Sequence, residues 1–168
     1  MSDYFAPGAQ RHGSQQHGTQ GATDWSKLSA ANVRAHDQTW TAPEAFLGVL
    51  LAAMLCDGGA ATEEIEALQA ILNRSRSFKT IPPEQLSGAV DEISARIQSN
   101  PDCVAAACAA LPEDMRATAF ALALDLILAD NELTRTEAKF LNDLTSWLQL
   151  DNGTVQHISE VIVVKNSF

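Results

Sequence analysis

The chain has 168 residues, 46% of them hydrophobic, which is enough to fill the core of one domain of ordinary size. Its formal net charge of −10 falls entirely after residue 40, and an acidic domain of this kind is repelled by nucleic-acid phosphates, so direct nucleic-acid binding is not expected. The start of the chain lacks the pattern of a secretion signal, and no apolar run reaches the roughly 18 residues that a membrane span needs. We therefore expect a cytoplasmic protein.

Residues 1–23 are rich in Gly, Gln, Ser and His and carry no periodic apolar positions, which predicts a disordered tail. His12 and His17 could bind a soft metal, but a solvated tail is the favoured interpretation. The folded domain is expected to span residues 24–168. The three cysteines contain no Cys-x-x-Cys pair and lie among small apolar residues, so we interpret them as reduced and mostly buried.

Capping and turn residues divide the folded part into helices. Thr41 and Glu44 have the spacing of a capping box with Pro43 at the first helical position, Gly58-Gly59 is a break, and Pro82-Pro83-Glu84 begins another helix. The expected helices are a short one within 24–37, then 43–56, 62–78, one that begins at Pro83, an Ala-rich one between Asn100-Pro101-Asp102 and Leu111-Pro112, 115–129, 135–150, and a last segment to Val164.

The last segment contains Val161-Ile162-Val163-Val164, which has the composition of a strand as much as of a helix. No partner strand is visible elsewhere in the sequence, so we expect a helix. The fold class that follows is all-α: a compact bundle of about seven helices, with the apolar segment 115–129 as the central helix.

A helix–loop–helix pattern occurs twice in the sequence. In each copy an apolar helix ends at an Asp, a short loop follows, and a Glu lies seven residues after the Asp in the next helix. Two such hairpins can pack about a pseudo-two-fold axis, each covering the apolar face of the other. A shift of 73 positions superimposes Leu47 on Phe120, Leu51 on Leu124, Leu55 on Leu128, Asp57 on Asp130, Glu64 on Glu137 and Leu68 on Leu141.

The repeated acids have two interpretations. Asp57 and Asp130 lie at helix C-termini, where a carboxylate is unfavourable by roughly 0.3–1 kcal/mol. One interpretation is that each compensates by accepting backbone N–H bonds in a turn. Glu137 completes a capping box with Thr134, but the position equivalent to Thr134 in the first copy is Ala61. Capping therefore does not explain both glutamates, and a shared role as oxygen ligands is the alternative.

Clusters of carboxylate oxygens favour Ca²⁺, Mg²⁺ or Mn²⁺ over Zn²⁺. The loops are not EF-hands, because position 12 counted from each Asp is Leu68 or Leu141 and not the required Glu. Asp125 interrupts the apolar helix 115–129 and would be costly to bury without a partner. It is expected to pair with Arg116 or Arg135 or to reach water, and joining the acidic cluster is the other alternative.

The segment Ala117 to Leu150, ATAFALALDLILADNELTRTEAKFLNDLTSWLQL, and its echo LAAMLCDGGAATEEIEALQAIL at Leu51 to Leu72 resemble the TerB-like tellurite-resistance family. In that family an Asp-Gly sequence followed by a pair of glutamates closes one helix and opens the next. The second copy departs from this pattern with Asn131 in place of Gly, and the first with Cys56 in place of Ala.

The resemblance implies an all-α, seven-helix, non-enzymatic domain linked to tellurite and other chemical stress, acting through metal binding and through protein contacts near the membrane. The metal-site residues it implies are Asp57, Glu64, Asp130 and Glu137, with Asp125 as a further candidate. An enzyme is disfavoured, since the sequence offers no nucleophile paired with a base and no phosphate-binding Gly loop. The alternative is an acidic protein-interaction scaffold that uses no metal.

Overall fold

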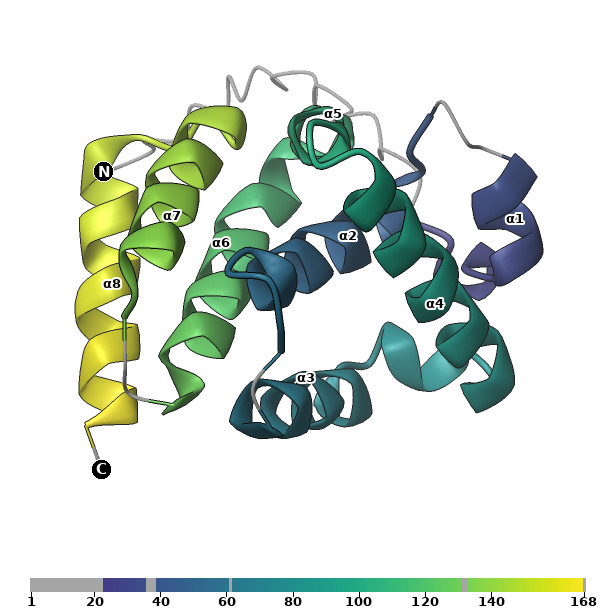
Figure 1. Cartoon of the computed structure of the whole chain (residues 1–168), viewed down its shortest axis with the longest axis horizontal. Helices are drawn as coiled ribbons and strands as arrows, with labels where there is room; N and C mark the ends of the chain where they lie inside the picture. The colour runs from purple at the N-terminus through teal and green to yellow at the C-terminus, as the bar shows by residue number, and fades with distance from the viewer. Residues whose placement is uncertain (1–22, 36–38, 61, 131–132, 168) are drawn as a thin grey trace, which may run out of the picture.

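The computed structural model describes residues 23–35, 39–60, 62–130 and 133–167, and these form an all-α bundle without a strand (Figure 1). The predicted fold class is therefore confirmed. The elements are the 3-10 turn η1 (Trp25–Lys27), α1 (Ala30–Ala35), α2 (Ala42–Leu55), α3 (Thr62–Arg74), η2 (Phe78–Thr80), α4 (Pro83–Ser99), α5 (Cys103–Ala110), α6 (Glu113–Ile127), η3 (Leu128–Asp130), α7 (Arg135–Trp147) and α8 (Asn152–Asn166).

Helix α2 forms the centre of the bundle. Apart from Glu44 in its first turn it is apolar, and it is buried from Pro43 to Met54, packing against α4, α5 and α6 (Figure 1). The sequence predicted that residues 115–129 would be central, but α6, which covers most of them, has half-buried positions such as Leu122 and lies along α2. The first helices of the two repeated units are thus packed directly against each other.

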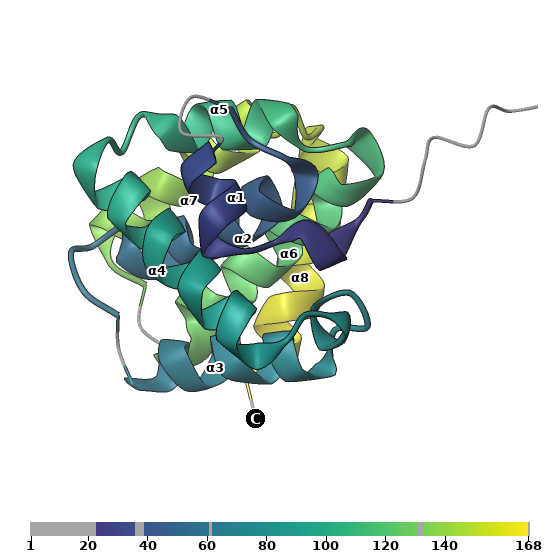
Figure 2. The ribbon, with the colours of Figure 1, turned by 90° about the vertical axis from the view of Figure 1, so that its right-hand side faces the viewer.

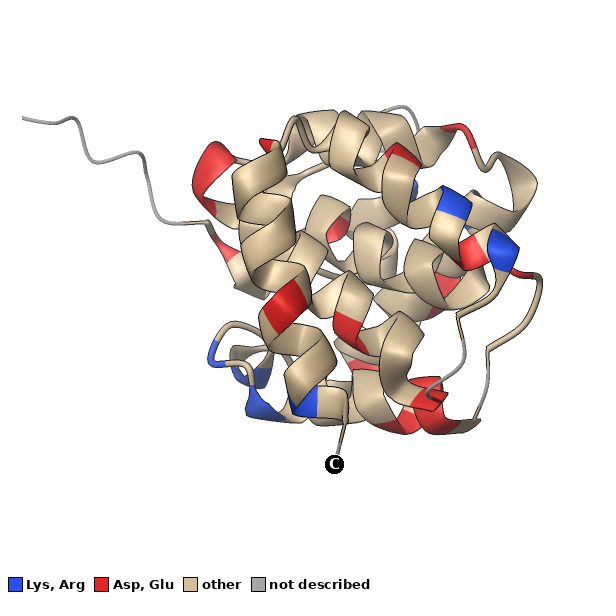
Figure 3. Ribbon diagram, turned by 90° about the vertical axis from the view of Figure 1, so that its left-hand side faces the viewer, with Lys and Arg blue, Asp and Glu red and all other residues tan. Residues whose placement is uncertain are grey.

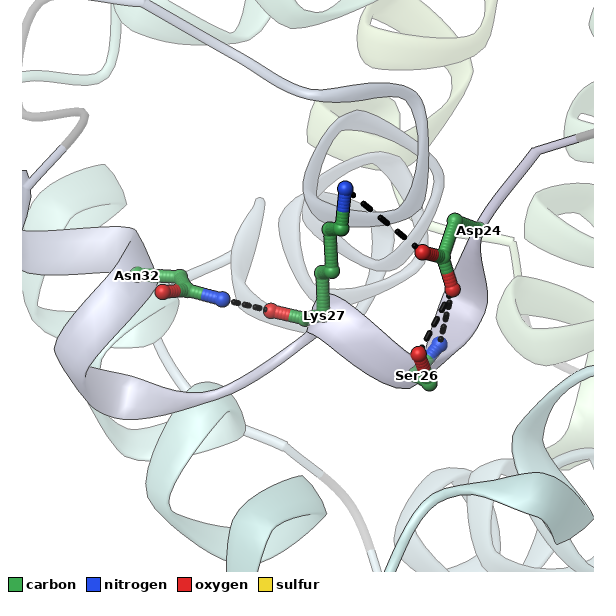
Figure 4. Close-up of polar contacts among 4 residues, drawn as sticks. All are labelled: Asp24, Ser26, Lys27 and Asn32. Atoms are coloured by element: carbon green, nitrogen blue, oxygen red, sulfur yellow. Dashed lines mark hydrogen bonds and ion pairs between the residues drawn. The ribbon is translucent and has the colours of Figure 1, made fainter.

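The start of the described chain closes one side of the core. Asp24 begins η1 by accepting hydrogen bonds from the Ser26 backbone N–H at 3.2 Å and from its hydroxyl at 2.6 Å, and the Asn32 side chain donates to the Lys27 carbonyl (Figure 4). Helix α1 then packs on α4 and buries Val33 (Figure 2). Within 24–37, where the sequence predicts one short helix, the structure has a 3-10 turn followed by α1.

The helix expected over residues 62–78 ends earlier, at Arg74. The reason is Phe78, which is only 2% exposed and packs against Trp25 with ring centroids 4.9 Å apart. An uninterrupted helix would not bring Phe78 into this cluster, so the chain turns after Arg74 and forms η2. The last segment, in contrast, is the predicted helix, α8.

The prediction of a disordered tail concerns residues outside the described part of the chain, apart from Thr23, whose hydroxyl donates to the Met115 sulfur at 3.8 Å. His12 and His17 also lie outside it. Among the helices that are described, none combines the length and the apolar character needed to cross a membrane.

Candidate functional site

The first acidic loop begins with a tight turn at the end of α2. Gly58 has a φ of 99°, a conformation that glycine adopts without steric cost, and the Asp57 carboxylate accepts a hydrogen bond from the Gly59 backbone N–H at 3.3 Å. The Asp57 side chain remains exposed. Asp57 therefore accepts a backbone hydrogen bond in a turn, which is the first of its two interpretations. Part of its carboxylate remains open to solvent.

Glu137 lies in the first turn of α7 and caps it. Its carboxylate accepts a hydrogen bond from the Thr134 backbone N–H at 2.6 Å, while the Thr134 hydroxyl accepts one from the Glu137 N–H at 3.2 Å. The capping box predicted from the sequence is therefore confirmed. Glu137 is only 4% exposed, and Glu44, at the same position of the α2 capping box, is 1% exposed.

Glu64, the equivalent residue of the first copy, has the same burial. It is 4% exposed, whereas its neighbours Glu63 and Ile65 are exposed. Both glutamates of the repeat thus point inward from the first turn of a helix. This inward direction is shared by the two copies even though the capping partner found at Thr134 has no equivalent hydroxyl in the first copy.

The two acidic units approach each other at Cys56. The pKa of the Cys56 thiol is raised to about 12, mostly by burial and in addition by the negative charges of Glu137, Asp57 and Glu64, which disfavour the thiolate. Because such charge effects weaken with distance, the three carboxylates lie within electrostatic range of this thiol, although they do not form a close cluster with it. The thiol itself is protonated at neutral pH and is a poor nucleophile.

Asp130 ends η3 and is exposed. The turn η3 packs against α3, so the second loop lies beside the helix that carries Glu64 (Figure 1). Residues 131 and 132 of this loop, including Asn131, are outside the described residues. Asp130 therefore lies close to the first helix–loop–helix copy.

Asp125 has a different environment from the other candidates. Its carboxylate pairs with the Lys165 ammonium at 2.7 Å and accepts a hydrogen bond from the Asn166 amide at 3.0 Å. The expectation of a paired carboxylate is correct, but the partner is on α8. Arg116, one of the expected partners, instead donates to the Leu111 carbonyl at 3.2 Å.

The placement of these side chains limits what they can hold without movement. Within the described residues, no three His, Cys, Asp or Glu side chains are grouped closely enough to hold a metal ion. One Glu137 oxygen already serves the α7 cap, and one Asp57 oxygen serves the turn. The arrangement is two neighbouring acidic loops, each with a buried glutamate behind it, and it is an incomplete ligand set for a divalent cation.

Charged residues are distributed unevenly over the surface. Figure 3 shows Asp and Glu on many elements of this side of the molecule, whereas Lys and Arg gather in two places, at the lower left and at the upper right of the view. The acidic character expected from the sequence is therefore a property of the folded surface, and it favours cations and basic proteins as partners.

A groove next to Cys56 was not predicted from the sequence. It has a volume of about 530 Å³ and lies between the end of α2, the α4–α5 corner and α7. Its apolar lining comes from segments distant in the chain, so the helical periodicity of each segment gave no signal of it. The main apolar residues that line the groove are Leu55, Ile97, Val104, Phe140 and Trp147.

Comparisons with known proteins found no significant match to this chain. No family model matches this sequence, and no curated protein or solved structure is significantly similar to it. The resemblance to TerB-like proteins therefore rests on the repeated Asp and Glu pattern of the chain and enters below as part of a proposal.

Proposed function

We propose that this chain is a non-enzymatic, cytoplasmic TerB-like protein of the response to tellurite and other chemical stress, and that its two acidic loops together bind a divalent cation. The observation that carries the proposal is the convergence of the loops. Glu64 and Glu137, equivalent residues of the two copies, are both 4% exposed and both act on the Cys56 pKa. Burial of a carboxylate is costly, and Glu137 already has part of that cost offset by the Thr134 N–H.

A hard cation bound near the two glutamates would add a further offset. Ca²⁺, Mg²⁺ and Mn²⁺ prefer oxygen ligands, and water molecules commonly complete their coordination. Asp57 lies in the turn after α2 and Asp130 is the last residue of η3, and both are exposed, so a hydrated cation can reach them from solvent. In this proposal the two aspartates contribute ligands, and Glu64 and Glu137 provide the negative charge behind them.

The alternative function is an acidic interaction scaffold without metal. It is supported by the hydrogen bonds that Asp57 and Glu137 already make within the chain, which give both residues a structural purpose. The scaffold alternative predicts no saturable cation site. A cation that fixes the loops for recognition by a protein partner would combine the two functions.

The proposal is tested by the melting temperature of chelator-stripped protein in the presence of Ca²⁺, Mg²⁺ or Mn²⁺. A cation that binds only the folded state raises the melting temperature with its concentration. The variant Asp57→Asn/Asp130→Asn removes two negative charges from exposed ligand candidates and is expected to lose this rise.

A matched control separates specific binding from general charge screening. Asp91 and Glu113 are exposed residues of α4 and α6, and Asp91→Asn/Glu113→Gln removes the same charge from the molecule. This control is expected to keep the full rise. An equal rise in both double variants would exclude the two loops as the cation site.

A further inference from the structure

The groove beside Cys56 has the composition of a binding surface for an apolar side chain. Phe140 and Trp147 lie in its lining, and their rings meet edge to face with centroids 6.3 Å apart. Leu55, Ile97 and Val104 supply the rest of the main apolar lining. Aromatic and aliphatic side chains that line a concave surface are typical of sites that take apolar anchors from a ligand.

The charges around this apolar lining are predominantly negative. Lys139 and Asp143 both line the groove and are paired at 2.7 Å, so together they add no net charge. Asp102 lines the groove from the α4–α5 corner and is exposed. Next to Cys56, which contributes to the lining, Asp57 is exposed, whereas Glu64 and Glu137 are buried and are not available to a partner.

An apolar groove with negative surroundings is complementary to a basic amphipathic helix. The apolar residues of such a helix, spaced i, i+3, i+4 and i+7, enter the groove while lysines and arginines at its sides meet the carboxylates. We propose that this groove docks a basic amphipathic helical segment of a partner protein. The proposal is independent of cation binding by the loops, since the lining and Asp102 are present whether or not a cation is bound.

A second copy of the chain is a poorer occupant. Helix α8 exposes Val161 and Val164, but this chain carries a formal charge of −10 and would bring like charge to an acidic groove. Like charges brought together at an interface are unfavourable. A basic partner of different sequence fits the charge as well as the shape.

The probe for this site is a fluorescein-labelled 18-residue peptide of Leu and Lys arranged as an amphipathic helix, and the readout is fluorescence anisotropy with the full chain. Saturable binding is expected. The variant Ala105→Arg places a bulky cation in the groove lining, where both its size and its charge oppose the peptide. It should weaken the affinity by about tenfold or more, which corresponds to about 1.4 kcal/mol.

The matched control is Ala109→Arg. Ala109 is an exposed residue of the same helix α5, and it is outside the groove lining. Since it changes the net charge equally, it should alter the affinity by less than about twofold if the groove is the site. Equal losses in both variants would mean that the peptide responds only to overall charge and would overturn the proposal.

Three further measurements make the outcome decisive. Unlabelled peptide should change the tryptophan emission of the wild type, and Trp147→Phe should remove that change while binding persists, because Trp147 lines the groove. A peptide in which Glu replaces every Lys should not bind. Equal binding of the acidic peptide, or a dimer of this chain in sedimentation analysis that Ala105→Arg dissolves, would contradict a basic partner helix.

Discussion

The carboxylate of Asp125 on α6 lies 2.7 Å from the ammonium of Lys165 on α8. This pair joins two residues that are 40 positions apart in the chain, and Asn166 adds a second donor to the same oxygen at 3.0 Å. The Asp125 side chain is 18% exposed and that of Lys165 is 57% exposed, so the pair is at the margin between surface and core. It holds the last turn of α8, a helix with no fully buried residue, against the bundle.

The Asp125–Lys165 pair should contribute measurably but modestly to stability. A double-mutant cycle with Asp125→Asn and Lys165→Gln is expected to give a coupling energy of about 0.5 to 1 kcal/mol in urea unfolding. The coupling should decrease in 1 M salt, because Lys165 is exposed to screening. A coupling of zero at low salt would show that α8 is held by its apolar contacts alone.

The α7 capping box predicts an ordered series of stabilities. Thr134→Ala removes the acceptor of the Glu137 N–H and should lower the free energy of unfolding by about 1 kcal/mol. Thr134→Ser keeps the hydroxyl and should restore most of the loss. Urea unfolding measures both variants, and equal losses from Ala and Ser would indicate that the Thr134 methyl group, and not its hydroxyl, stabilises the helix.

The two glycines of the first loop should respond differently to the same substitution. Gly58→Ala forces an alanine into a φ of 99° and should destabilise the protein by about 1 kcal/mol or more. Gly59→Ala meets no atom within 4 Å and has no positive φ, so it should be neutral or slightly stabilising. Thermal unfolding of the two variants provides the comparison, and similar melting temperatures would contradict the assigned turn.

Alkylation of the Cys56 thiol should be slow at ordinary pH, and its rate should not reach a plateau between pH 8 and 10. Its pKa of about 12 means that the thiolate fraction, and with it the rate of iodoacetamide alkylation, should rise about tenfold per pH unit between pH 8 and 10. Removing a nearby negative charge with Glu64→Gln lowers the pKa and should raise the rate at each pH. Mass spectrometry distinguishes Cys56 from the buried Cys103 and Cys108.

The same reaction reports on a bound cation. A positive charge near Cys56 stabilises the thiolate, so a cation bound between the loops should accelerate alkylation. Asp91→Asn, a substitution of an exposed residue on α4, should leave the acceleration unchanged. A rate that is independent of the cation would place any bound ion away from Cys56.

Local signals in the sequence predicted most of the fold. Pro83 and the Thr134–Glu137 box start helices α4 and α7 where they were expected, because helix starts depend on side chains within one turn. The end of α3 was predicted wrongly because it depends on Phe78 packing against Trp25, which is more than 50 positions away. The partner of Asp125 was missed for the same reason, since Lys165 meets it only through tertiary packing.

The site was predictable only in part. The repeat indicated that Glu64 and Glu137 are equivalent, and both are indeed buried. Nothing in the spacing indicated that both would lie near Cys56, or that Phe140 and Trp147 would form a groove with Ile97. Those relations arise from packing between helices, whereas sequence periodicity describes one helix at a time.

The most direct test of the central claim is calorimetric titration of the chelator-stripped chain with Ca²⁺, Mg²⁺ and Mn²⁺. Two acidic loops that share a cation predict saturable heat with about one ion per chain, and the Asp57→Asn/Asp130→Asn variant should lose that heat while the Asp91→Asn/Glu113→Gln control retains it. Heat of dilution alone with all three cations would contradict the claim and leave the acids as turns, caps and surface charge.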